Sequence, residues 1–177
     1  MQVIEKRGAQ ATRSAARPLS APEARLLDAV ERHARLRRRF WRAVRVVGAL
    51  SLLAVGAVHL QQYDYLYSSI PTIGTLFLLN FVGATAIGLG LLTPVDRLFG
   101  RWSGAVVALL ALGGAGLAVT AFTFLLVSER TPLFGFMEPG YDPPALMAAR
   151  VAELVTFALL GSLFVAQLAR RARRGRW

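Results

Sequence analysis

Four apolar stretches constrain the fold of this chain more than any other feature of its sequence. They lie near residues 43–62, 71–92, 103–127 and 145–169. Each is close to or above the roughly 20 residues that an α-helix needs to cross about 30 Å of hydrocarbon. The hydrophobic fraction of 55% and the mean hydropathy of +0.47 also exceed what is usual for soluble domains. We therefore expect an all-α fold, with a four-helix transmembrane bundle over residues 43–169.

The distribution of basic residues predicts how this bundle is oriented. Twelve Lys or Arg lie in residues 1–47, two arginines lie between the second and third stretches, and five lie in a basic tail, residues 170–177. The connection 61–70 has none. Because basic loops stay in the cytoplasm, we expect both termini to be cytoplasmic and the first and third connections to face outward. This placement accounts for the net charge of +11 without a nucleic-acid partner.

The residues before the first stretch divide into two parts. Residues 1–19 have no apolar run and are expected to form a disordered cytoplasmic tail rather than a secretory signal. Residues 20–42 are predicted to form a basic amphipathic helix that starts at a capping box, Ser20 to Glu23. Two interpretations of this helix remain open. It binds anionic lipid or the acidic patch of a partner, or it is a solvated segment that only holds the N-terminus in the cytoplasm.

Small residues and turn residues predict how the helices start and pack. Asp142 precedes two prolines and is a candidate N-cap for the fourth helix. Small residues, or Asn, recur at spacings of three or four in two of the stretches, which predicts close contacts inside the bundle. These positions are Asn80, Ala84 and Gly88, and Gly104, Ala108, Ala111, Ala115 and Ala118.

Four polar or charged residues lie within the apolar stretches, namely His59, Asn80, Arg150 and Glu153. Such residues are costly in lipid, face the bundle interior, and are functional candidates by default. Together with two residues next to His59, they form the predicted ligand-binding set, which is His59, Gln62, Tyr63, Asn80, Arg150 and Glu153.

Two arrangements of these residues remain open. Arg150 and Glu153 are three residues apart, so they share a helix face and can form a structural pair. Alternatively, Glu153 turns toward His59 and the two share a proton, while Arg150 faces an anionic ligand or the lipid headgroups. A purely structural His59 would instead have its ring nitrogens satisfied by Gln62, Tyr63 or a neighbouring helix end.

The residue types limit the chemistry. The chain has no cysteine and only two histidines, one of them within a span, so we expect no metal, haem or other cofactor. No nucleotide-binding, protease or hydrolase motif is present, so an enzyme is unsupported and no catalytic residue is predicted.

The third connection, residues 128–144, is unusually apolar for an exposed loop. Its apolar residues are Leu133, Phe134, Phe136, Met137 and Tyr141. We expect it either to fold over the outer mouth of the bundle and close a lipophilic pocket, or to dip into the headgroups.

Two sequence segments carry a resemblance. HLQQYDYLYSSIPTIGTLFLLN, from His59, and LFGFMEPGY, from Leu133, resemble a group of four-helix membrane proteins from high-GC bacteria. The hairpin arrangement is also loosely similar to the DoxX-like superfamily, some of whose members hold small lipophilic or redox partners. The resemblance implies a ligand-holding bundle in a bacterial cytoplasmic membrane, and assigns no residue.

Three functions follow from these observations. The first is a non-enzymatic binding or accessory protein with an outward-facing polar pocket for a lipophilic molecule or lipid. The second is a structural or assembly subunit of a larger membrane complex, which fits the small size and the small-residue strips. The third is a proton-coupled transporter or membrane redox enzyme that uses His59 and Glu153.

Overall fold

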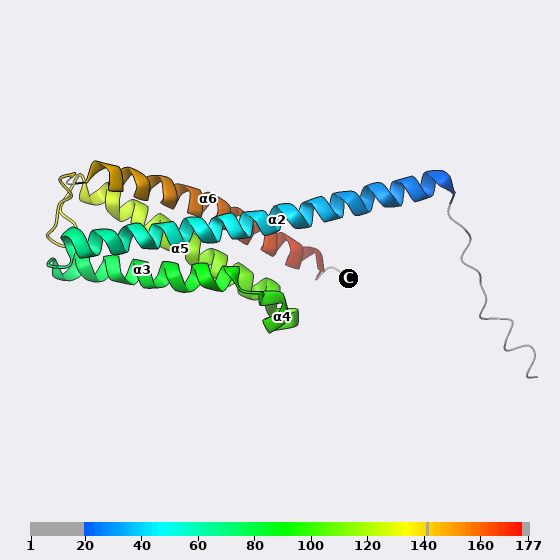
Figure 1. Ribbon diagram of the computed structural model, residues 1–177, viewed down its shortest axis with the longest axis horizontal. Coiled ribbons are helices and arrows are strands. Elements are labelled where there is room, and N and C mark those ends of the chain that lie inside the picture. The colour runs from blue at the N-terminus through cyan, green and yellow to red at the C-terminus, as the bar shows by residue number, and fades with distance from the viewer. Residues whose placement is uncertain (1–19, 141, 175–177) are drawn as a thin grey trace, which may run out of the picture. The chain divides into compact units, whose positions relative to one another are not determined.

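The computed structural model describes residues 20–140 and 142–174 (Figure 1). All the secondary-structure elements within these residues are helices, apart from one isolated bridge between Leu133 and Phe136. Four segments are long and apolar enough to cross a membrane: Ala21–Tyr67, Pro71–Leu92, Val95–Ser128 and Pro143–Arg173. The chain is therefore a multi-pass membrane protein with four candidate spans. The expected tail over residues 1–19, Tyr141 and the last three residues of the basic tail lie outside the described residues.

The chain divides into two units, and the N-terminal unit ends at Arg39. Helix α2 (Ala21–Gln62) starts in this unit. The backbone N–H and the hydroxyl of Ser20 both donate to the Glu23 carboxylate, at 2.8 and 2.7 Å. The predicted capping box is thus present in part, but the hydroxyl donates to the carboxylate instead of accepting the Glu23 amide. His33 is exposed, and its Nδ1 lies 2.9 Å from the Ala29 carbonyl oxygen.

The second unit, from Phe40 on, holds the bundle. Its elements after α2 are η1 (Tyr63–Tyr67), a single π-helical turn, then α3 (Pro71–Leu92), α4 (Val95–Phe99), η2 (Gly100–Trp102), α5 (Ser103–Ser128) and α6 (Pro143–Arg174). In Figure 1, α3, α5, α6 and the part of α2 within this unit run side by side. The turn η1 and the connection between α5 and α6 lie at one end of the bundle, and α4 lies at the other.

The starts of α3 and α6 agree with local sequence signals, whereas α2 continues without a break from the predicted amphipathic segment, residues 20–42, into the first apolar stretch. Helix α3 has the predicted bounds, with Pro71 in its first turn, where the missing N–H is not needed. Helix α6 starts two residues before the predicted stretch. The Asp142 carboxylate accepts a hydrogen bond from the Ala145 N–H at 3.1 Å, which confirms Asp142 as the N-cap.

The small residues of the predicted strips lie inside the bundle. Ala84 and Ala111 are fully buried, and Gly104 is the one strip residue that is only half-buried. A Cβ on Gly56 would lie 3.0 Å from the Ala84 Cβ and 3.4 Å from the Phe81 carbonyl oxygen. Helices α2 and α3 can approach this closely only because residue 56 has no side chain.

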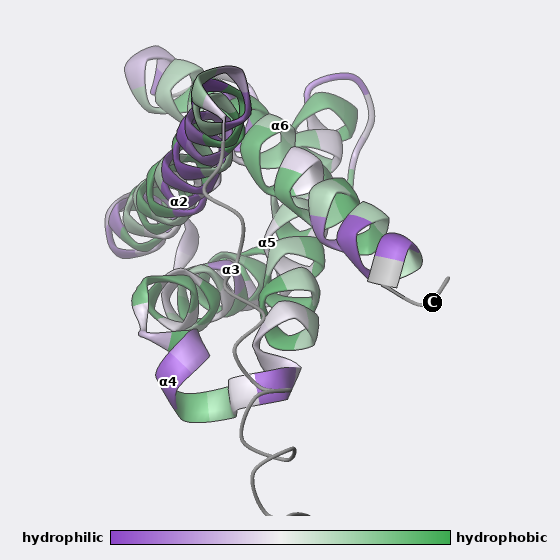
Figure 2. Ribbon diagram, turned by 90° about the vertical axis from the view of Figure 1, so that its right-hand side faces the viewer, coloured by the Kyte–Doolittle hydropathy of each residue, from purple (hydrophilic) through white to green (hydrophobic). Residues whose placement is uncertain are grey.

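The buried core and the outer surface of the bundle are both apolar. The core cluster is Val44, Ala49, Leu52, Ala84, Leu91, Val95, Val107, Ala111, Ala115, Leu160 and Leu163. Large side chains such as Leu79, Leu109 and Val165 are exposed on the outside. Figure 2 shows that hydrophobic residues cover most of α3 and α5. An apolar exterior of this kind is what a bundle surrounded by lipid requires.

Candidate functional site

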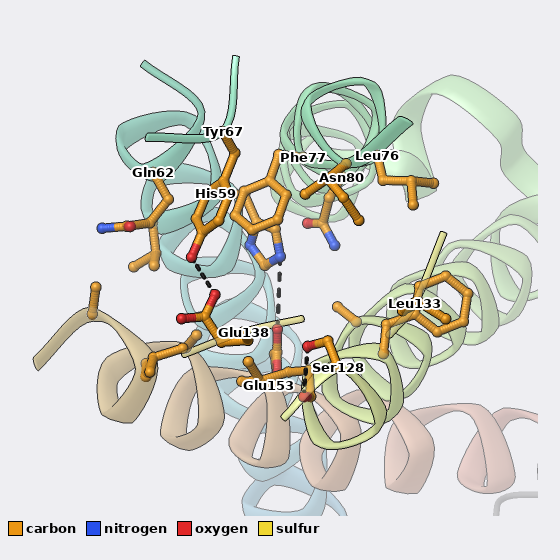
Figure 3. Close-up of a pocket in the computed structure, with 18 of the residues that line it drawn as sticks. His59, Gln62, Tyr67, Leu76, Phe77, Asn80, Ser128, Leu133, Glu138 and Glu153 are labelled. Atoms are coloured by element: carbon orange, nitrogen blue, oxygen red, sulfur yellow. Dashed lines mark hydrogen bonds and ion pairs between the residues drawn. The ribbon is translucent and has the colours of Figure 1, made fainter. Parts of the chain in front are cut away.

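A cavity of about 220 Å³ lies at the end of the bundle that carries η1 and the α5–α6 connection (Figures 1 and 3). Its lining comes from α2, η1, α3, α5, α6 and that connection. Most of the walls are apolar, and the apolar and aromatic lining residues include Val58, Ile73, Leu76, Phe77, Leu117, Phe124, Leu133, Phe136, Leu146 and Ala149. Apolar walls with a few polar groups are typical of sites for small molecules.

Four of the six residues predicted to bind a ligand line this cavity. They are His59, Gln62, Asn80 and Glu153, from three different helices. Tyr63 and Arg150 are outside the lining.

His59 and Glu153 face each other across the cavity (Figure 3). His59 is 9% exposed and lies in the last turn of α2. Its Nδ1 lies 2.9 Å from the Val55 carbonyl oxygen. Because a carbonyl oxygen can only accept, this hydrogen bond places a proton on Nδ1. The other nitrogen, Nε2, lies 3.8 Å from Glu153 Oε1, within ion-pair range and beyond direct hydrogen bonding.

The Glu153 carboxylate is the most deeply buried acidic group of the site. The residue is 1% exposed, and its Oε2 has no hydrogen-bond partner among the described residues. A buried polar atom without a hydrogen-bond partner raises the free energy of the folded state, so such atoms are rare in folded proteins and can indicate a binding site. Glu153 therefore offers the cavity an unused hydrogen-bonding oxygen.

Arg150 does not pair with Glu153, although both lie on α6. Its guanidinium instead forms an ion pair and hydrogen bond with Glu129, which follows the end of α5. Of the two arrangements left open by the sequence, the structure therefore has Glu153 turned toward His59. Arg150 links α6 to the start of the α5–α6 connection.

Asn80 supplies a second unused acceptor. It is 7% exposed, and its Oδ1 has no partner in the part of the chain that the structure describes. Asn80 belongs to the same strip of α3 as Ala84, which packs on Gly56 of α2. The small-residue contact therefore turns Asn80 toward the bundle interior, and Figure 3 shows its amide near the ring of His59.

Tyr67 and Glu138 form a polar contact that the sequence analysis did not include in the site. The Tyr67 hydroxyl donates to the Glu138 carboxylate (Figure 3). The other Glu138 oxygen accepts from the Gly140 N–H at 2.8 Å, and the Glu138 N–H donates to the Ser128 carbonyl at 2.8 Å. Both Tyr67 and Glu138 are buried and line the cavity. The available signal for Glu138 was an acidic residue directly after the apolar run Phe136–Met137.

The π-helical turn η1 gives Tyr67 its position. This turn directly follows Gln62 and ends at Tyr67. The ring of Tyr67 packs against Phe77, with ring centroids 4.5 Å apart. Phe77 in turn lies 5.0 Å from the His59 ring, and Tyr67 meets Phe136 edge-on at 5.5 Å. Single π-helical turns within helices occur often at functional sites. No local sequence signal predicted this turn.

The α5–α6 connection covers the cavity and is tied to the helices by polar contacts. Its Leu133, Phe136 and Glu138 contribute to the lining, so the connection does fold over this end of the bundle. Gln62 donates to the Asp142 carboxylate at 2.8 Å. Together with the Glu138 and Glu129 contacts above, this gives the connection three carboxylate links to α2, η1 and α6.

The site has hydrogen-bonding groups but no cluster suited to a metal ion. Within the described residues, no group of three or more His, Asp or Glu is placed to hold a metal. The polar end of the cavity can therefore accept hydrogen bonds through Asn80 and Glu153, and can hold a proton between His59 and Glu153.

No family model, curated protein or solved structure matches the chain.

Proposed function

We propose that the chain is a membrane protein that binds a small lipophilic molecule in the cavity next to His59, as a binding or accessory protein rather than an enzyme. The observation that carries this proposal is the pair of unpartnered buried oxygens, on Asn80 and Glu153, at the polar end of an otherwise apolar cavity. A site of this kind is suited to bind a ligand with an apolar body and a polar head. Gln62 belongs to its supporting contacts, and Tyr63 and Arg150 are peripheral to it.

The size of the cavity supports a small ligand. A buried apolar cavity of roughly 150 Å³ holds benzene. A volume of about 220 Å³ therefore fits a ring with a short chain, or the head end of a longer lipid. The aromatic side chains of Tyr67, Phe77, Phe124 and Phe136 supply flat walls for such a body.

A cavity-filling substitution tests this proposal. Ala149 is buried, lines the cavity and lies on α6, whereas its neighbour Ala148 is exposed and does not line it. Native mass spectrometry of the protein purified in mild detergent should show a retained small molecule. Ala149→Phe should abolish the retained mass, and Ala148→Phe should preserve it. A protein that releases no small molecule in several detergents, or an equal loss in both variants, would contradict the proposal.

The contact between His59 and Glu153 favours a second candidate, a proton-coupled transporter or a membrane redox enzyme. An imidazole and a carboxyl group 3.8 Å apart can exchange a proton through one bridging water. Reconstituted in vesicles with a pH-sensitive dye inside, the protein should then carry protons together with a solute. Loss of that flux in Glu153→Gln and its retention in Arg150→Gln would support this candidate over simple binding.

We also infer the orientation from the arginines, with both termini in the cytoplasm of a bacterial cell, the cavity on the outer side of its cytoplasmic membrane, and the basic segment before the bundle near anionic lipid. The absence of cysteine gives a clean test. An impermeant maleimide applied to whole cells should label Ser69→Cys, in the first connection, and should not label Leu98→Cys, in the second. The reverse pattern would overturn this orientation.

Two broader proposals remain. First, the loose resemblance of the hairpin arrangement to the DoxX-like superfamily leads us to propose that the chain shares a ligand-holding bundle with that superfamily. Alternatively, the chain is an assembly subunit of a larger membrane complex, and stoichiometric partner chains recovered in mild detergent would then replace the retained small molecule.

A further inference from the structure

The polar end of the cavity offers acceptors to its occupant. Asn80 Oδ1 and Glu153 Oε2 are buried, belong to side chains more than nine-tenths buried, and have no hydrogen-bond partner among the described residues. Both residues line the cavity and lie on different helices, α3 and α6. Two unsatisfied acceptors on separate walls of one cavity call for a group that donates a hydrogen bond.

The histidine adds a third acceptor. Since Nδ1 of His59 donates to the Val55 carbonyl, the neutral ring presents the lone pair of Nε2 toward Glu153. When the pair holds one more proton, either Nε2 or the carboxyl group becomes a donor. The head group that suits both states is one that can donate and accept at the same atom, and a hydroxyl does so.

The rest of the lining limits the ligand to a neutral molecule with an apolar body. Among the described residues no Lys or Arg lines the cavity, so a carboxylate or phosphate head would meet the acidic groups of Glu138, Asp142 and Glu153 without a Lys or Arg to balance it. An ammonium head would lose its hydration in a cavity with mostly apolar walls, and two of the three acidic groups already accept hydrogen bonds from the protein. A neutral hydroxyl avoids both penalties.

We propose that the cavity selects lipophilic molecules that carry a hydroxyl head, an alcohol or a phenol, and that this hydroxyl donates its single hydrogen bond to Asn80 Oδ1 or to Glu153 Oε2. This specificity rests on the proposed binding function and adds the chemical class of the ligand. The cavity should therefore bind a hydroxyl compound more tightly than the methyl ether of the same compound. A ligand of the same shape whose hydroxyl is capped by a methyl group can donate to neither acceptor and binds more weakly.

The test uses two hydroxyl compounds, para-propylphenol and n-nonanol, each with its methyl ether. Both hydroxyl compounds have about ten non-hydrogen atoms, a size that suits a cavity of this volume. Isothermal titration of the full chain in lipid nanodiscs, with empty nanodiscs subtracted, gives the dissociation constants. Each hydroxyl compound should bind about 10- to 100-fold more tightly than its ether. The phenol and alcohol arms distinguish an aromatic from an aliphatic source of the hydroxyl.

Two variants test whether the difference in affinity between hydroxyl compound and ether depends on Asn80. Asn80→Leu removes one acceptor while keeping a similar shape, so the ratio between hydroxyl compound and ether should fall by about tenfold. Thr75→Val removes an exposed hydroxyl of the same helix that lies outside the cavity lining, and it should leave the ratio unchanged. If Asn80→Leu does not fold, Glu153→Gln is measured instead. Gln keeps one acceptor oxygen but replaces the other carboxylate oxygen of Glu153 with a donor. The ratio between hydroxyl compound and ether should therefore also fall in Glu153→Gln.

The outcomes separate the two proposals. If the hydroxyl compounds and ethers bind equally, or the ethers bind more tightly, the cavity binds lipophilic molecules but the hydroxyl specificity is wrong. If the ratio is large but identical in Asn80→Leu and Thr75→Val, the assignment of Asn80 is wrong. If no compound binds above the empty-nanodisc signal, both the specificity and the proposed binding function fail.

Discussion

The Nε2 atom of His59, at the end of α2, lies 3.8 Å from Oε1 of Glu153, on the fourth membrane helix. This contact joins the first and last helices of the bundle at the base of the cavity. Its two groups are the only pair of histidine and carboxylate in contact within the described bundle residues. Four predictions test the contacts that build the site around it.

Pairing of Glu153 with His59 predicts energetic coupling between these two residues. In a double-mutant cycle of His59→Gln and Glu153→Gln, the two changes should be coupled by about 1 kcal/mol in the free energy of unfolding. Unfolding can be followed by titration with sodium dodecyl sulfate in mixed micelles. The matched cycle of Arg150→Gln and Glu153→Gln should show no coupling. Coupling in the second cycle alone would instead support the pair within α6.

Loss of the Tyr67 hydroxyl should loosen the connection that covers the cavity. Tyr67→Phe removes the hydrogen bond to the Glu138 carboxylate, and bonds to charged groups contribute about 1.5–3 kcal/mol. Amide hydrogen exchange at Glu138 and Gly140 should therefore become at least about tenfold faster. Tyr65, which is 73% exposed, provides the control Tyr65→Phe. Equal exchange in both variants would show that the hydroxyl does not hold the connection.

Gly74 should tolerate no larger side chain. A Cβ at this position would lie 2.6 Å from the Tyr67 carbonyl oxygen, which is backbone and cannot rotate away. Gly74→Ala should therefore destabilise the protein by about 1–3 kcal/mol and shift Tyr67. At Gly83, on the same helix, the nearest atom would be 3.5 Å away on the flexible side chain of Leu117. Gly83→Ala should be neutral or stabilising by up to about 1 kcal/mol. Similar thermal shifts for both variants would argue against the close approach.

Asp142 should contribute through two separate hydrogen bonds. Its Oδ1 accepts from the Ala145 N–H, and its Oδ2 accepts from Gln62. Asp142→Asn keeps the first acceptor and loses the second, whereas Asp142→Ala loses both. The alanine variant should therefore be less stable than the asparagine variant by about 1 kcal/mol. Thermal unfolding of the two purified variants measures the difference, and equal stability would exclude a capping role.

The four membrane-length helices and the starts of α3 and α6 were predictable from the sequence because their causes are local. Apolar stretches of about 20 residues form helices in lipid, since every backbone polar group must be satisfied there. Pro71 and Asp142 mark helix starts by their own chemistry. The small-residue strips were predictable for the same reason, because their spacing follows the helical period.

The partners of the charged residues were decided by the tertiary structure. Arg150 and Glu153 are neighbours on one helix, yet they bind Glu129 and His59 respectively. The choice depends on how α6 is rotated about its axis and how far it is shifted along α2, and sequence spacing contains neither quantity. The contact of Tyr67 with Glu138 depends in addition on a π-helical turn and on the course of a loop. The sequence thus determined which polar residues enter the bundle, and the packing of the helices determined which of them meet.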